Sequence, residues 1–311
     1  MRCVTSHCNI FDIDRKNGER MLELPANLLH EHYNGFLHEL RKKRPETRNT
    51  YDRALREFLR WSISDRQFFF GIDDVGRYKD YLTNCKQLSQ ASVSTYLTAL
   101  RRFCQYLIDI NVLNNNPAKY VSGYHRPVAH SRSPLKHSEI EKLLSTIKRN
   151  NTRDLRDFIM IKIMLGCGLS EIELVQANIG DIQTLSGTTF IRVGCKKRRT
   201  KDISVPIPKD VREAINKYIG THVEDKPDSP LFLSAGNRDR GKRMTARGIR
   251  KRINYYLTMA GIKNNKQRQI TPHSLCHTAA LLMVEAGASP LQIQERMRLG
   301  SLAAAMMYVN Q

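Results

Sequence analysis

Apolar residues recur along most of this chain with the three-to-four-residue spacing of amphipathic helices. The spacing changes to alternation in residues 189–207, where two short apolar runs flank the basic segment CKKRRTK (195–201). This alternation predicts an antiparallel hairpin with a basic tip. We therefore predict a mostly α fold with one small antiparallel sheet, of the α+β class.

The helical pattern falls into two blocks, separated by the polar, proline-containing segment YHRPVAHSRSP (124–134). A chain of 311 residues is long enough to bury two separate cores. The expected organisation is an N-terminal extension over 1–24, a helical domain over 25–120, a linker over 121–135 and an α+β domain over 136–311. Ser138 and Glu141 have the spacing of a capping box and are expected to open the second domain.

The charge balance points to a polyanionic partner. A formal net charge of +21 favours nucleic acid, with an anionic membrane surface as the weaker alternative. The chain has no apolar run of about eighteen residues and no signal-peptide pattern. We expect a soluble, cytoplasmic protein that does not contact membranes.

The seven cysteines are odd in number and scattered, which favours reduced thiols over a disulfide framework. Cys3, His7 and Cys8 could form half of a metal site, but no second pair of ligands lies nearby in the sequence. No metal site is predicted there.

The C-terminal segment TPHSLCHTAALLMVEAGASPLQIQERMRLGSLAAAMMYVNQ (271–311) carries His273 and Tyr308 at a distinctive spacing. It resembles the active-site segment of the tyrosine recombinases, the phage integrase family, and the resemblance extends over roughly residues 25–311. It implies a helical, SAM-like core-binding domain and a tyrosine-recombinase-type catalytic domain that together clamp a DNA duplex. Family members recombine DNA at specific sites through a 3′-phosphotyrosyl intermediate and need no cofactor.

The resemblance also implies roles for individual residues. Tyr308 matches the nucleophile, His273 the histidine of the active-site motif, and Lys197 the hairpin lysine that serves as general acid, with Lys196 and Lys201 as rivals. His277 matches the second histidine of the motif. A weaker alternative is a metal site, because side chains of His273, Cys276 and His277 would share a helix face and could act as three ligands.

Three positions depart from the family pattern. The separation of Glu173 and Asp181 matches that of the family's Glu and Asp, and this aligns CGLSEIEL (167–174) with the family motif so that Ser170 stands at the first arginine position. An alignment shifted by two residues does not place an arginine at that position either. Cys276 stands at the second arginine position, and Leu299 stands where the family has histidine or tryptophan. These replacements predict that strand cleavage is lost or strongly impaired.

DNA contacts are expected from three basic concentrations, although a solvated charged face is the usual explanation for such runs. They comprise Lys196, Arg198, Arg199 and Lys201 on the hairpin, Arg247, Arg250 and Lys251 in the run 238–252, and Arg101 and Arg102 with the basic run 41–44 in the helical domain.

Three functions stay open at this point. The first is a DNA-binding protein of a mobile element with degenerate catalysis, acting as an accessory or regulatory subunit or as a decayed gene product. The second is an active recombinase that uses substitute cations, such as Arg298, an arginine of 238–252 or one from another protomer. The third is a non-catalytic module that binds RNA or protein. Double-stranded DNA is the expected partner, together with a homo-oligomer or a partner recombinase on that DNA.

Overall fold

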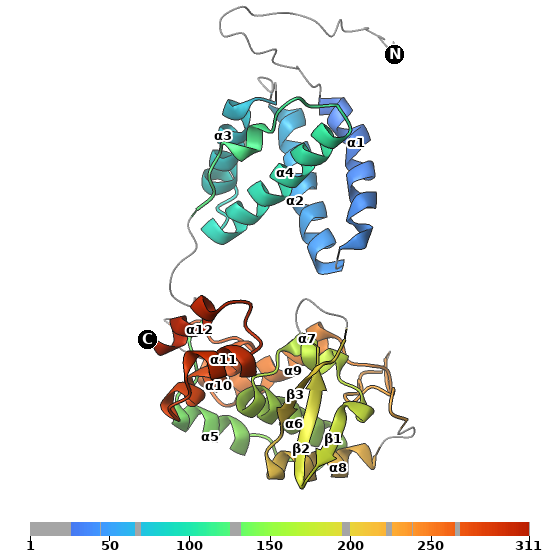
Figure 1. The fold of residues 1–311 in the computed structure, drawn as a ribbon, viewed down its shortest axis with the longest axis vertical. Coiled ribbons are helices and arrows are strands. Elements are labelled where there is room, and N and C mark those ends of the chain that lie inside the picture. The colour runs from blue at the N-terminus through green and yellow to red at the C-terminus, as the bar shows by residue number, and fades with distance from the viewer. Residues whose placement is uncertain are drawn as a thin grey trace, which may run out of the picture. The chain divides into compact units, whose positions relative to one another are not determined.

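The computed structural model describes residues 26–43, 45–65, 70–124, 132–194, 200–221, 226–237, 239–264 and 268–310. The chain divides into two compact units, with the boundary between Arg126 and Pro127. The mostly helical fold with a small antiparallel sheet is confirmed (Figure 1). No helix within these ranges is long and apolar enough to cross a membrane.

The first unit is a bundle in which α2 packs against α1 and α4 (Figure 1). Its helices are α1 Ala26–Glu39, α2 Pro45–Ser64, α3 Ile72–Asp80 and α4 Gln90–Asp109. Pro45 begins α2, where its missing N–H costs nothing, and the helix before it already ends at Glu39. Aromatic side chains fill much of the core, with Phe58, Tyr78 and Phe103 fully buried.

The second unit combines a three-stranded sheet at one side with helices that pack behind and beside it (Figure 1). The strands are β1 Ile182–Leu185, β2 Thr188–Val193 and β3 Ile203–Pro206. The helices are α5 His137–Ser145, α6 Thr152–Cys167, α7 Glu171–Gln176, α8 Lys209–Ile219, α9 Ala246–Met259, α10 Ser274–Glu285, α11 Pro290–Arg296 and α12 Leu302–Val309. The α6 helix is buried along most of its length and packs against α8 and α10.

The predicted hairpin corresponds to β2 and β3, which are antiparallel, with Ile191 opposite Val205. Both side chains are buried, so the alternating pattern correctly identified the inner face. The sequence did not predict β1, which pairs with the other edge of β2. Three of the four β1 residues are exposed, so the strand carries too weak an apolar alternation to be recognised.

The predicted start of the second domain's first helix is wrong in detail. The Glu139 carboxylate, rather than Glu141, accepts a hydrogen bond from the backbone N–H of Lys136 at 2.8 Å. The α5 helix begins at His137, so Ser138 lies inside it. A serine two residues into a helix cannot cap the first turn.

The end of α6 positions the segment 168–173, which leads into α7 and includes Ser170. Gly168 follows α6 with φ +63°, a conformation that residues with a Cβ rarely adopt. A Cβ there would also lie 2.3 Å from Sδ of Met297. The glycine therefore lets the chain turn sharply beneath the end of α11 and enter α7.

A buried ion pair fastens this turn to the C-terminal part of the chain. The Arg298 guanidinium pairs with the Glu173 carboxylate and donates to the Gly168 carbonyl at 2.8 Å and to the Arg296 carbonyl. The backbone N–H and hydroxyl of Ser170 donate to the same carboxylate at 2.6 and 2.7 Å. Arg298 has φ +54° and is 4% exposed, so both its backbone and its charge are held by the surrounding structure.

We predict that Arg298→Met lowers the free energy of unfolding by about 3–5 kcal/mol, because it leaves the buried Glu173 charge without its partner. Urea denaturation followed by circular dichroism measures the change. Arg296→Met is the matched control and should cost less than about 1 kcal/mol, since its guanidinium makes a 3.5 Å contact to the Pro206 carbonyl. Equal stability of Arg298→Met and the unmodified chain would contradict a stabilising role for the pair.

Candidate active site and nucleic-acid interface

Tyr308 and His277 form the centre of the candidate site. Tyr308 lies on α12 and His277 on α10, and both are buried. The Tyr308 hydroxyl lies 2.8 Å from Nδ1 of His277, within hydrogen-bonding distance. Burial, reinforced by the nearby Cys276, raises the pKa of Tyr308 to about 12. The phenol is therefore neutral at physiological pH and must lose its proton before it can attack phosphorus.

His273 lies at the start of α10, and its ring packs edge-on against that of His277 at 5.1 Å between centroids. Its side chain is 33% exposed, and Nδ1 lies 3.6 Å from Oε2 of Glu171. Oε1 of the same carboxylate lies 3.4 Å from Nε of Arg250. One carboxylate from α7 thus joins a histidine on α10 to an arginine on α9.

The Glu171 carboxylate stays ionised in spite of its surroundings. Burial favours its neutral form, but contact with His273, a backbone N–H and the charge of Arg250 outweigh burial and lower its pKa to about 2. A permanent negative charge therefore lies beside the histidine that the resemblance assigns to the phosphate site.

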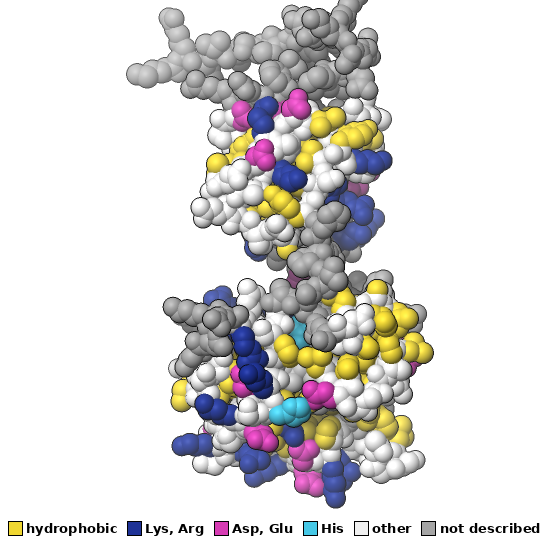
Figure 2. Space-filling model, turned by 90° about the vertical axis from the view of Figure 1, so that its left-hand side faces the viewer, with side chains coloured by type: hydrophobic (Ala, Val, Ile, Leu, Met, Phe, Trp, Pro, Cys, Tyr) yellow, Lys and Arg dark blue, Asp and Glu magenta, His cyan; other side chains and the backbone are white. Residues whose placement is uncertain are grey.

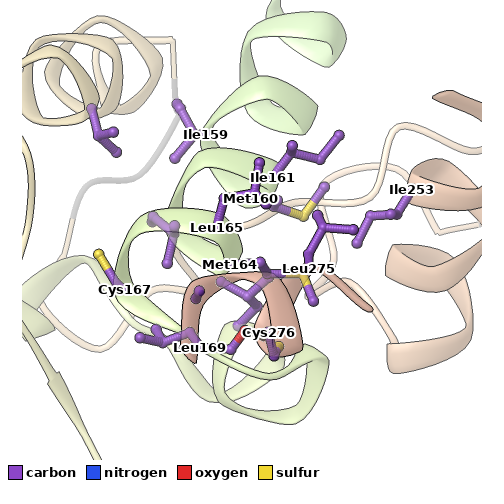
Figure 3. Packing of buried hydrophobic residues seen from close by; sticks show 14 of the residues in the cluster. Ile159, Met160, Ile161, Met164, Leu165, Cys167, Leu169, Ile253, Leu275 and Cys276 are labelled. Carbon is purple, nitrogen blue, oxygen red and sulfur yellow. Dashed lines mark hydrogen bonds between the residues drawn. The ribbon is translucent and has the colours of Figure 1, made fainter. Parts of the chain in front are cut away.

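Ser170 and Cys276, the two positions where the resemblance implies arginine, both bond to protein groups. Ser170 caps α7 and its hydroxyl donates to Glu173. Sγ of Cys276 donates to the Leu169 carbonyl at 3.1 Å. Figure 3 shows Cys276 beside Leu169 at the end of α6, among apolar side chains that include Met164 and Leu275. Cys276 therefore lies against the residue that precedes Ser170 in the chain.

The third replaced position, Leu299, is half-buried and packs against the apolar core. Its side chain has no hydrogen-bonding group that could meet a phosphate. The adjacent residue, Arg298, is a cation, but its guanidinium donates hydrogen bonds to Glu173 and to backbone carbonyls inside the protein.

Lys196, Lys197, Arg198 and Arg199, at the predicted hairpin tip, lie outside the described residues. The other hairpin cation, Lys201, pairs with the buried Asp181 carboxylate and donates to the Gln176 carbonyl at 2.6 Å. Lys201 therefore ties the base of the hairpin to the end of α7. The Lys201 ammonium is therefore engaged within the protein.

The other predicted DNA-binding residues divide into exposed and internally bonded groups. Arg247 and Lys251 on α9 and Arg102 on α4 are exposed. Arg101 instead donates to the carbonyls of Ala118 and Val121 at 2.9 and 2.6 Å and fastens the chain that follows α4. Figure 2 shows a histidine among basic and acidic side chains on one face of the second unit.

Two features of the site were not recognised from the sequence. The spacing Ser170-x-x-Glu173 is a capping-box signature, and it could have identified the role that Ser170 performs. The bridging role of Glu171 left no such signal, because it depends on contacts with α9 and α10, which come from distant parts of the chain.

Within the described ranges, no group of three or more His, Cys, Asp or Glu side chains could hold a metal ion. The alternative interpretation of His273, Cys276 and His277 as three metal ligands therefore finds no support.

Comparison with known proteins identifies the family. The phage integrase family model matches residues 134–311, and the model of the phage integrase N-terminal SAM-like domain matches residues 75–150. The chain is 27% identical over 298 residues to tyrosine recombinase XerC of Leptospira interrogans, covering 93% of this chain and 91% of the relative. It is 28% identical over 284 residues to the XerC of Escherichia coli O157:H7, covering 90% of each.

Among solved structures, the fold is similar to that of the XerH site-specific recombinase, which was crystallised with its palindromic difH substrate in a post-cleavage complex. The TM-score is 0.71 at 18% identity, over 92% of this chain and 81% of the other. At this identity the likeness concerns the fold alone. The family match to more than half of the chain shows that this protein belongs to the phage integrase family, the tyrosine recombinases.

Proposed function

We propose that this protein binds double-stranded DNA on a tyrosine recombinase scaffold and cleaves it very slowly or not at all. In this proposal it serves as an accessory or regulatory subunit, beside further copies or an active partner recombinase, or it is the product of a decayed mobile element. A cytoplasmic location is part of the proposal, since the expected substrate is DNA.

The charge distribution supports DNA as the partner. The net charge of +21 is matched by exposed basic residues on α9 and α4, including Arg247, Lys251 and Arg102. The similar XerH structure holds a recombination substrate. Contacts to many phosphates share the binding free energy, so binding tolerates the loss of a few catalytic side chains.

Cleavage makes stricter demands. A tyrosine that attacks a phosphodiester must lose its proton, the leaving oxygen must gain one, and cations must meet the charge that grows on the non-bridging oxygens. One arginine aimed at a transferring phosphoryl group is worth on the order of 10³–10⁵ in rate. The absence of two such arginines is therefore decisive for the chemistry.

The proposal rests on the chemistry and the hydrogen bonds of Ser170 and Cys276, the residues at the two arginine positions. Neither side chain can carry a positive charge, and both donate their hydrogen bonds within the protein, to Glu173 and to the Leu169 carbonyl. They bring no charge to a phosphate placed at Tyr308. The neutral Tyr308, with its pKa raised to about 12, adds a second barrier to attack.

An active recombinase with substitute cations is the competing proposal, and one observation favours it. Arg250 lies one carboxylate away from His273 and its side chain is 52% exposed, so it is placed to reach a phosphate near that histidine. Arg298 does not support this alternative, because it is buried against Glu173.

The protonation of Tyr308 has a measurable consequence for stability. Because folding raises its pKa from about 10 to about 12, the neutral phenol stabilises the fold fully below about pH 10, and this contribution is lost as the pH rises towards 12. We expect the stability advantage of the unmodified chain over Tyr308→Phe to fall by about 1 kcal/mol between pH 9 and 11. Guanidinium denaturation at both pH values measures it, and a constant difference would contradict the raised pKa.

Non-specific binding to duplex DNA should weaken steeply with salt. Replacing Lys196, Lys197, Arg198 and Arg199 by Ala should flatten the dependence of log affinity on log salt by about 0.9 for each phosphate that the protein no longer neutralises. Fluorescence anisotropy with a labelled duplex measures the slope, and Lys217→Ala on α8 is the control for an exposed lysine. An unchanged slope would place the hairpin off the DNA, and tighter binding of RNA than of duplex DNA would favour an RNA-binding module.

Restoring the missing charges should recover some chemistry. The variant Ser170→Arg with Cys276→Arg, and in a second version with Leu299→His, is expected to form a covalent adduct on a nicked suicide duplex more readily than the unmodified chain. Each substitution alone should do little, because members of one catalytic constellation are not additive. Adding Tyr308→Phe must abolish the adduct, and an adduct that survives this change would show a different nucleophile.

A further inference from the structure

Glu171 is the residue at the site that neither the fold nor the family resemblance explains. The first turn of α7 is capped by Ser170 and Glu173, which bond to each other, and Glu173 also pairs with Arg298. Glu171 takes no part in that network. Its carboxylate points instead to His273 and Arg250, at 3.6 and 3.4 Å.

These two contacts are loose for charged partners. Charge-assisted hydrogen bonds between a cation and a carboxylate are usually about 2.7–2.9 Å long, and both contacts of Glu171 exceed that range. The carboxylate is 9% exposed, whereas His273 and Arg250 are 33% and 52% exposed. The anion is thus enclosed, and the two groups that it bridges remain open to an approaching molecule.

A phosphodiester is chemically suited to replace this carboxylate. Like Glu171, it presents two oxygens that share a negative charge, and a guanidinium binds either group in the same bidentate geometry. A DNA phosphate that approaches His273 therefore meets a site whose positive charge is already shared with an internal anion.

We propose that His273 and Arg250 form a phosphate-binding pair for the DNA backbone and that Glu171 is its built-in counter-anion, which weakens the grip of the pair on DNA. This inference rests on the proposed DNA-binding function. It adds Arg250 to the phosphate contact that the family resemblance implies for His273, and it names Glu171 as the residue that opposes the pair. The pKa of Glu171, lowered to about 2, agrees with a carboxylate that stays charged whenever DNA is bound.

The test is the salt dependence of duplex binding by Glu171→Gln, measured by fluorescence anisotropy. The amide keeps the shape and removes the charge. We expect about two- to fivefold tighter binding in low salt, the range for removing one partly exposed ion pair, and a salt slope steeper by about 0.9 because one more cation is available. Glu213→Gln on α8, an exposed residue, removes the same formal charge and should leave the slope unchanged.

Arg250→Gln completes a double-mutant cycle. Because Arg250 is half-exposed, its replacement is not expected to unfold the protein. In the E171Q background it should cancel the gain in affinity and in slope, and in the unmodified background its effect should be smaller. Equal effects of Arg250→Gln in both backgrounds, or identical binding by Glu171→Gln and Glu213→Gln, would overturn the inference.

The outcomes for the two proposals are distinguishable. If the unmodified chain shows no salt-dependent binding to duplex DNA, the proposed function itself fails. If it binds with a steep salt dependence and Glu171→Gln does not change the slope, only the role of Glu171 fails. Thermal unfolding of each variant checks the fold.

Discussion

The buried contact of Glu173 with Arg298 and Ser170 organises the whole site. It joins the turn after α6 to the chain between α11 and α12, and so fixes the helix that carries Tyr308 relative to α7. A carboxylate at this depth needs all its donors. Ser170 and Arg298 meet that need, and both side chains are therefore held inside the protein at this point.

In the proposed function, the described groups around Tyr308 bind a phosphate but activate it poorly. Tyr308 bonds to His277 and is neutral, and His273 shares its surroundings with the Glu171 anion. Arg250 approaches this histidine from α9, and it too faces Glu171. Catalysis depends on charge placed where charge develops in the transition state. In the proposed function, the carboxylates beside Arg250 and Arg298 therefore disfavour cleavage.

Much of this could be predicted from the sequence, and the failures have physical causes. The helical periodicity and the alternation over 189–207 predicted the fold class and the β2–β3 hairpin. β1 was missed because a mostly exposed strand carries little apolar alternation. The capping box was misplaced to Ser138 because the motif leaves the exact helix start open. The roles of Glu171 and Arg298 depend on contacts between residues 79 and 125 positions apart, which local patterns do not encode.

We propose that this recombinase scaffold holds DNA without cutting it. The most direct test is to incubate the unmodified chain with a nicked suicide duplex at a concentration where anisotropy shows full binding, and then to denature the sample and look for protein attached to the 3′-phosphate. We expect the protein to saturate the duplex and to dissociate from it completely on denaturation. A 3′-phosphotyrosyl adduct that forms efficiently with the unmodified chain and disappears with Tyr308→Phe would contradict it.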